Sequence, residues 1–408
     1  MAAMAATADI SQPGISPQRS RTDVADLAIA VACGLALLVS ALLLALLPAA
    51  GHLTSSCDFI SYWATGQQLV HHGNPYDPIA MERIEHAAGW AGTGAYYMRN
   101  PPWALPLAWP LGLFSARAAV LPWSLVMFAV LAIAVRMLWT MFSPHTRRID
   151  LLGYAFPPAL LCVVMGQTSL LALLGLVLFL RLHRTQPFGA GAALWLCTLK
   201  PHLFVPFAVV LLVWIVVSRS YRILYGAGLA GAATCLLTLW IDPRAFVQYL
   251  AWARTSGITQ QPVPCLAVLL RRLIDPAATW LVLVPCVIGC CWAVKYFFDH
   301  KNKWDWIEHG SLLMLVSLVV APYCFLFDQS LAIPALLYTA GRFASRRALI
   351  ALALLYLLVE LQPLFFPAPA VAYWVWLLAG PAWLAWYWIA RRTEAAPQIA
   401  HAPAPASA

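Results

Sequence analysis

Long apolar runs separated by short polar connections dominate the chain. A helix needs about 20 apolar residues to cross a hydrocarbon core about 30 Å thick. The runs cover residues 27–47, 118–142, 151–165, 168–182, 188–200, 202–218, 222–241, 277–298, 309–326, 329–340, 347–366 and 371–390. This pattern predicts an all-α polytopic membrane protein with about 12 transmembrane helices, some of them short or re-entrant and buried among their neighbours.

Composition indicates the same class of protein. The 408 residues are 62% hydrophobic and 10% charged, and the mean hydropathy is +0.77. A water-soluble core of this size cannot bury so much apolar surface. The ten cysteines lie mostly inside apolar runs, where they behave as small core residues.

The basic residues predict the orientation in the membrane. Lys and Arg are enriched in short cytoplasmic loops, and most of the 25 basic residues fall in inner connections if the N-terminus is inside. This topology explains the net charge of +9 without a nucleic-acid partner. Both termini are then expected in the cytoplasm. The bilayer that surrounds the helices is expected to be a plasma membrane.

Two long segments fall on the outer side in this topology, residues 48–117 and 242–276, and they hold many of the acids. Residues 23–392 are predicted to form a single integral membrane domain. The flanking segments, residues 1–22 and 393–408, are rich in Ala, Pro and Ser and are predicted to be disordered cytoplasmic tails.

The first outer segment contains its own helical pattern. Apolar and aromatic positions over residues 59–72 predict an amphipathic helix that lies along the membrane interface. Residues 102–114, rich in Trp, Leu and Pro, predict a second interfacial or half-inserted stretch. Together these two stretches would cover the helix bundle as a lid.

Five short motifs occur along the chain in a fixed order. They are Asp58-Phe59, Gly73-Asn74-Pro75-Tyr76-Asp77, Asn100-Pro101-Pro102, Gly166-Gln167 and Lys200-Pro201. In this order they resemble the membrane-bound glycosyltransferase family 87, a family of polyprenol-phosphate-mannose-dependent enzymes of the GT-C fold class. The likeness covers roughly residues 55–345.

The resemblance implies a GT-C-like helix bundle and a specific reaction. A hexose, mannose in this family, would pass from a polyprenyl-phosphate donor to a hydroxyl of a glycolipid or glycan acceptor on the outer face, with inversion at the anomeric carbon. No cofactor or bound metal is expected, although a loosely held divalent cation on the donor phosphate stays open. The alternative from the residues alone is a polytopic transporter or lipid flippase, and the chain lacks the matching halves typical of one.

Asp58 is the candidate catalytic base. A carboxylate at the edge of the bilayer is suited to take the proton of an acceptor hydroxyl, and the resemblance gives an acid in the first outer loop this role. Asp58 also precedes a predicted helix, where Asp favours the N-cap position. Both roles stay open.

Three basic residues are candidates for holding the donor phosphate. Lys200 lies between two apolar runs, where an ionisable residue is costly and often functional, or its long side chain extends to the interface. His202 is a phosphate donor or a buried polar residue. Arg99 contacts the same phosphate or lipid headgroups.

Five polar residues are predicted for the substrate pocket. Tyr62 lies one helical turn after Asp58 and packs against the sugar or the lid. Gln167 reaches the cavity or bonds backbone carbonyls in a helix break. Asp328 contacts the sugar or N-caps a short helix. The remaining two, Asn74 and Tyr76, line the pocket or shape the turn through Asx-type hydrogen bonds.

Overall fold

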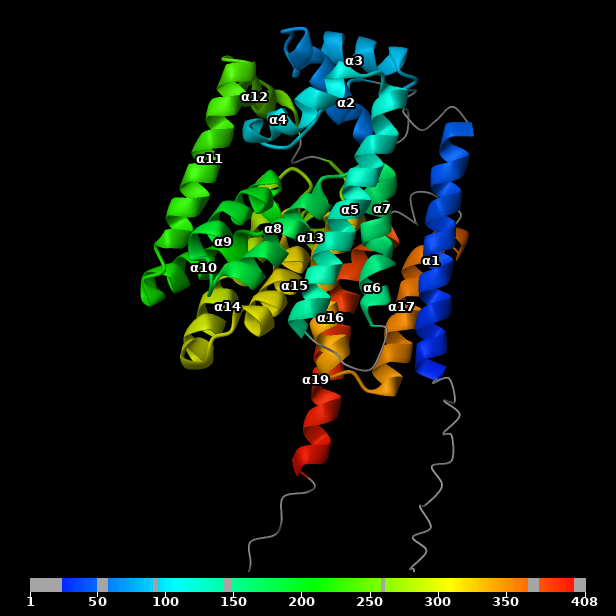
Figure 1. Ribbon diagram of the computed structural model, residues 1–408, viewed down its shortest axis with the longest axis vertical. Helices are drawn as coiled ribbons and strands as arrows, with labels where there is room; N and C mark the ends of the chain where they lie inside the picture. Colours follow the sequence, from blue (N-terminus) through cyan, green and yellow to red (C-terminus); the bar gives the residue numbers. More distant parts are fainter. Residues whose placement is uncertain are drawn as a thin grey trace, which may run out of the picture.

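Helices build the part of the chain that the structure describes, and that part contains no strand. The computed structural model describes residues 24–49, 58–90, 92, 94–142, 149–257, 261–365 and 374–399. The all-α class predicted from the sequence is therefore confirmed (Figure 1).

The body of the molecule consists of helices that match the apolar runs, several of them broken into two pieces. In chain order they are α1 (Val24–Ala49), α5 (Ala116–Phe142), α6 (Asp150–Tyr154), α7 (Pro157–Met165), α8 (Ser169–Leu182), α9 (Pro187–Ala193), η3 (Leu194–Leu199), η4 (Pro201–Leu203), α10 (Val205–Ser218), α11 (Arg222–Ile241), η6 (Thr279–Leu283), α14 (Val284–His300), η7 (Lys301–Lys303), η8 (Trp306–Gly310), α15 (Ser311–Val320), η9 (Leu326–Ala332), α16 (Ile333–Arg342), α17 (Arg346–Phe365), η10 (Trp376–Leu378) and α19 (Ala379–Ile399).

Four of these segments are long and apolar enough to cross a membrane by themselves. They are Val24–Leu42, Ala116–Phe142, Arg222–Ile241 and Thr279–Lys303. Five other apolar segments are shorter, as the sequence predicts for broken or re-entrant segments: Asp150–Met165, Ser169–Leu182, Pro187–Leu199, Val205–Ser218 and Trp306–Val320. The molecule is thus a membrane protein, and the total of about 12 spans stays a prediction.

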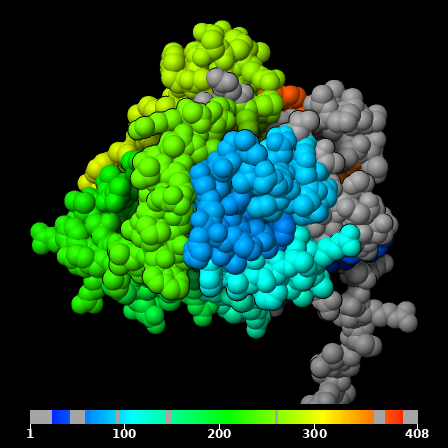
Figure 2. Space-filling view, turned by 90° about the horizontal axis from the view of Figure 1, so that it is seen from above, coloured from blue at the N-terminus to red at the C-terminus, as the bar shows by residue number. Residues whose placement is uncertain are grey.

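Most helices of the two long connecting segments gather at one end of the molecule. The first segment forms α2 (Phe59–Val70), α3 (Pro78–Ala87), η1 (Pro102–Ala104), α4 (Leu105–Ala108) and η2 (Trp109–Leu113), and the second forms α12 (Ala245–Thr255) and α13 (Leu266–Ile274). In Figure 1, α2, α3, α4 and α12 lie at the top, whereas α1 begins and α19 ends below. Seen from above, the first segment in blue lies beside yellow-green residues of the second (Figure 2).

Helix α2 begins as predicted but is not an exposed interfacial helix. Ten of its twelve residues are buried, because α3, α4, η2 and α5 pack around it. It crosses α4 and η2 closely, since a Cβ on Gly66 would lie 2.2 Å from the carbonyl oxygen of Ala108 in α4 and 2.7 Å from the backbone nitrogen of Gly112 in η2. The prediction of an amphipathic helix lying on the membrane surface is therefore wrong for residues 59–70, since the stretch at residues 102–114 covers it.

The turn before α3 has the hydrogen bonds that its sequence predicts. The side-chain oxygen of Asn74 accepts from the backbone N–H of Tyr76 at 2.9 Å. Asp77 caps α3 by accepting from the N–H groups of Ile79 at 2.9 Å and Ala80 at 3.1 Å. These bonds fix the path of the chain into α3.

Buried side chains from α1 to α19 form one continuous apolar cluster. The single domain predicted for residues 23–392 stays a prediction. Helix α19 continues to Ile399, past residue 393, where the sequence predicts the tail to begin. Residues 1–23 and 400–408, and the greater part of the two predicted tails with them, lie outside the described residues.

Candidate active site

A cavity of about 360 Å³ lies beneath the start of α2, where residues 96–101, η3 and η9 meet. We call it the central cavity. Seven residues selected from the sequence line it: Asp58, Tyr62, Arg99, Gln167, Lys200, His202 and Asp328. The other two, Asn74 and Tyr76, line a separate and more open hollow.

Asp58 immediately precedes α2, and only 5% of the residue is exposed. Its side chain makes no capping hydrogen bond to the helix. One carboxylate oxygen accepts from the hydroxyl of Tyr96 and the other from the side-chain amide of Gln167. The carboxylate is therefore turned into the central cavity and does not serve as an N-cap.

Gln167 owes its position to a tight turn between α7 and α8. Gly166 has a φ of +73°, a conformation that favours glycine, and a Cβ there would lie 2.7 Å from the Cβ of Phe59. The indole N–H of Trp123 donates to the carbonyl of Gly166 at 2.7 Å. The Gly166-Gln167 motif thus provides a turn that fits directly against α2.

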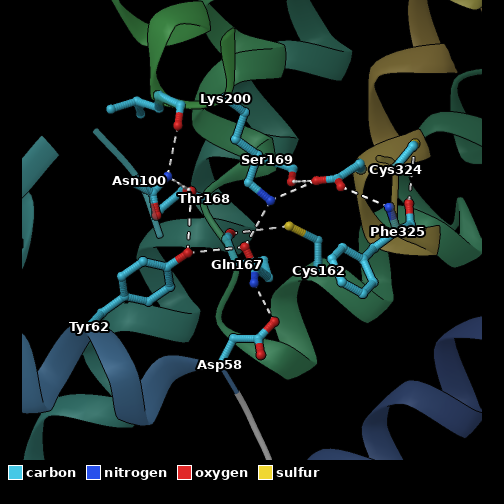
Figure 3. A network of polar contacts seen from close by, with 12 residues as sticks. Asp58, Tyr62, Asn100, Cys162, Gln167, Thr168, Ser169, Lys200, Cys324 and Phe325 are labelled. Carbon is cyan, nitrogen blue, oxygen red and sulfur yellow. Dashed lines mark hydrogen bonds and ion pairs between the residues drawn. The ribbon is translucent and has the colours of Figure 1, made fainter. Parts of the chain in front are cut away.

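The carboxamide of Gln167 joins the two sides of the central cavity. Its N–H donates to Asp58, and its oxygen accepts from the ammonium of Lys200 at 2.9 Å and the hydroxyl of Tyr62 at 3.0 Å. Figure 3 shows Gln167 between Asp58 and Lys200. Of the two roles open from the sequence, the side chain takes the one inside the cavity.

Lys200 and Asp328 form a buried ion pair. The ammonium lies 2.6 Å from a carboxylate oxygen of Asp328, and the side chains are 10% and 1% exposed. Lys200 therefore does not extend to the surface. Asp328 also accepts from the hydroxyl of Ser169 at 2.7 Å and the N–H of Phe325 at 3.0 Å.

Asp328 stays ionised although it is buried. Burial alone would raise its pKa, but the charge of Lys200, with smaller effects of His202 and of the hydrogen bonds from Lys200 and Ser169, holds the pKa below its ordinary value. The prediction that Asp328 N-caps a short helix is wrong. It sits inside η9 and accepts from the N–H of Phe325, the residue before that helix.

Arg99 and His202 complete the polar lining. The guanidinium of Arg99 donates to the side chain of Gln261, and among the described residues no carboxylate forms an ion pair with it. His202 stacks on Tyr323 with ring centres 3.6 Å apart. The Nε2 atom of His202 is buried and has no hydrogen-bond partner among the described residues.

Two residues that the sequence did not select as site residues hold this arrangement. The hydroxyl of Tyr96 bonds Asp58. The amide of Asn100 donates to the carbonyl of Leu199 at 2.9 Å and to the hydroxyl of Thr168 at 3.2 Å, which fixes the chain just before Lys200. The available signal was the run Tyr-Tyr-Met-Arg-Asn-Pro-Pro at residues 96–102, in which only Arg99 was taken as a site residue.

Glu85 positions the segment that carries Tyr96. It is fully buried in α3, and one carboxylate oxygen accepts from the backbone N–H of Tyr96 at 2.8 Å. Burial raises the pKa of Glu85 to about 7, against a smaller lowering effect of this hydrogen bond. Glu85 is thus connected to Asp58 through Tyr96, whose backbone N–H bonds Glu85 and whose hydroxyl bonds Asp58.

The arrangement is suited to moving a proton and holding an anion. Asp58 offers a carboxylate at the edge of the central cavity, and Arg99 offers a cation whose charge is not offset by a paired acid in the described chain. No group of three or more His, Cys, Asp and Glu residues suited to a metal occurs among the described residues. The expectation of no resident metal stays a prediction.

Comparison with known proteins gives one match. The model of Glycosyltransferase family 87 matches residues 97–322, more than half of the chain. The matched part contains Arg99, Gln167 and Lys200, whereas Asp58 and Asp328 lie outside it and join it through hydrogen bonds. None of the curated proteins or solved structures compared with the chain gave a match.

Proposed function

The chain belongs to glycosyltransferase family 87 and is a membrane glycosyltransferase, and we propose that its donor is a polyprenyl-phosphate hexose, with mannose as the sugar. One observation carries the proposal. Asp58, Gln167 and Lys200 are joined by hydrogen bonds in one cavity that Arg99 also lines. A proton acceptor and anion-binding groups therefore face the same space.

In the proposed reaction Asp58 is the general base. The acceptor hydroxyl attacks the anomeric carbon, a new carbon–oxygen bond forms, and the bond to the phosphate oxygen breaks on the opposite side with inversion. The hydroxyl proton passes to Asp58. Tyr96 and Gln167 each occupy one lone pair of a carboxylate oxygen, and an ionised carboxylate has about four such sites, so the acceptor can still bond it.

The leaving polyprenyl phosphate carries negative charge, for which Arg99 is the best-suited cation. The charge of Lys200 is already offset by Asp328 at 2.6 Å. Among the described residues Arg99 bonds a neutral amide, that of Gln261, and lies over the ring of Tyr96. A phosphate can replace the amide with a stronger, charge-assisted bond. The unpartnered Nε2 atom of His202 would contribute a hydrogen bond.

The apolar wall of the central cavity suits the lipid end of the donor. Met165, Leu199, Phe325, Phe327 and Trp376 line it beside the polar groups. The basic inner loops of the sequence support our proposal that the reaction takes place at the outer face of a plasma membrane, with both termini in the cytoplasm. Membership in a glycosyltransferase family argues against the transporter or lipid flippase.

The donor class can be tested directly with the full chain in lipid nanodiscs. It is incubated separately with polyprenyl-phosphate mannose and with a nucleotide-activated mannose, and release of polyprenyl phosphate or of nucleotide is measured. We expect turnover of the lipid donor only, with Arg99→Gln raising the KM for that donor. Turnover of the nucleotide sugar in the absence of a lipid donor would contradict the proposal.

A further inference from the structure

A second hollow of about 620 Å³ opens beside the central cavity at the same end of the molecule. It lies between the turn before α3 and one face of α12, and we call it the α12 groove. The residues used below are Asn74, Tyr76, Tyr97, Arg244, Gln248 and Trp252. Two of them, Asn74 and Tyr76, come from the motif that lies apart from the central cavity.

Aromatic rings form the inner wall of the α12 groove. Trp252 packs against Tyr76 and Tyr97, with ring centres 5.5 Å apart in both pairs. Tyr249 lies behind them, 5.7 Å from Tyr76 and 5.6 Å from Trp252. Such rings offer apolar faces with polar edges, on which the C–H face of a sugar ring can lie while its hydroxyls stay free to bond.

Two polar atoms in this wall lack a hydrogen-bond partner among the described residues. They are the hydroxyl of Tyr76, a residue only 5% exposed, and the side-chain oxygen of Gln248. A buried polar group without a partner is costly. Both atoms are covered by neighbouring groups, and a turn of each side chain towards the α12 groove would let a ligand rich in hydroxyl groups bond them, since each hydroxyl can donate and accept.

The α12 groove and the central cavity share a wall. Tyr97 lines both hollows, and Tyr249 lines the central cavity while packing against Tyr76 and Trp252 of the groove. A chain of sugars lying in the groove would therefore lead towards the space that Asp58 faces. Among the described residues that line the groove, Arg244 is the one with a charged side chain, which suits a neutral or anionic glycan.

We propose that the α12 groove binds sugar units of the acceptor, so that the acceptor is a glycan whose end enters the central cavity. This inference rests on the proposed function and adds the chemical class of the acceptor. The polyprenyl donor would then occupy the apolar side of the central cavity, and the growing glycan the open groove.

The test measures binding of soluble trisaccharides of mannose, glucose, galactose and N-acetylglucosamine to the full chain in nanodiscs by saturation-transfer NMR. The variants are Gln248→Ala, which removes an unpartnered oxygen, and Trp252→Leu, which removes an aromatic face. Arg254→Ala is the matched control, because Arg254 is an exposed residue of the same helix outside the groove lining.

We expect at least one trisaccharide to bind. Its dissociation constant should rise about 3- to 10-fold in Gln248→Ala, the effect of one hydrogen bond, and should stay the same in Arg254→Ala. In transfer assays Gln248→Ala should raise the KM for the acceptor by the same factor and leave kcat unchanged. Trp252→Leu should weaken binding at least as much, and its melting temperature shows whether it is folded.

Two results would overturn the inference. One is that no trisaccharide binds, and the other is that Gln248→Ala binds as tightly as the unchanged protein. A failure of the proposed function gives a different result from a failure of this inference. If the proposed function is wrong, Asp58→Asn keeps full turnover, whatever the α12 groove binds.

Discussion

Replacing Asp328 by asparagine should destabilise the protein strongly, because it removes a charge while keeping the shape of the side chain. Lys200 would keep its 2.9 Å bond to Gln167 but lose the carboxylate 2.6 Å away. Removing one partner of a buried ion pair costs about 3–5 kcal/mol. We expect about 3 kcal/mol, the low end, since the central cavity of about 360 Å³ can admit water to the ammonium.

The free energy of unfolding is measured by titration with SDS in mixed micelles. Asp299→Asn is the matched control, because its carboxylate also lies 2.6 Å from a lysine, Lys295, but is 50% exposed, so it should cost less than about 1 kcal/mol. The double variant Lys200→Met with Asp328→Asn should be more stable than Asp328→Asn alone, because no unpaired charge is left. Equal losses of unfolding free energy in Asp328→Asn and Asp299→Asn would refute a buried pair. The same holds if the loss in the double variant is the sum of the losses in Lys200→Met and Asp328→Asn.

Two further predictions concern the supports of the site. Burial raises the pKa of Glu85 from 4.5 to about 7. Between these two pH values the folded state holds a proton that the unfolded state has lost. The free energy of unfolding should therefore fall as the pH rises from about 4.5 to 7, by at most about 1.4 kcal/mol per pH unit. Unfolding titrations across this range check it, and a Glu85→Gln variant with the same slope would exclude Glu85 as the cause. Gly166→Ala should cost about 2 kcal/mol or more and reduce turnover, because it strains a positive φ and meets Phe59. Gly228→Ala, where a Cβ meets nothing within 4 Å inside α11, should keep turnover and should lower neither stability nor folding, since Ala favours a helix over Gly. Normal melting and turnover of Gly166→Ala would show that the turn does not position Gln167.

The fold class could be predicted from the sequence because it depends on local pattern. Apolar runs and the Gly, Pro and Asn residues between them mark helices and their ends. The same pattern could not show that α2 is covered on nearly every side. Its burial depends on η2, more than 40 residues later, and on the close approach of Gly66 to Ala108, which no local periodicity encodes.

The candidate site was only partly predictable, for a similar reason. Each of the three main residues has a local signal. Asp58 and Lys200 are charged residues beside apolar runs, and Gln167 belongs to a Gly-Gln break between two runs. That they meet depends on packing between α2, the α7–α8 turn and η3. The role of Asp328 as the partner of Lys200, 128 residues away, and of Tyr96 as a donor to Asp58 could not be read from their neighbours.

The central claim is that Asp58 takes the proton of the acceptor, and Asp58→Asn tests it most directly. The full chain and the variant are purified into nanodiscs, supplied with polyprenyl-phosphate mannose and an acceptor glycan that the unchanged protein uses, and polyprenyl phosphate release is measured. Asp299→Asn controls for the change from acid to amide, and melting temperatures confirm that both variants are folded. We predict that Asp58→Asn loses turnover by at least about 100-fold while Asp299→Asn keeps it, and full turnover by a folded Asp58→Asn would contradict the account.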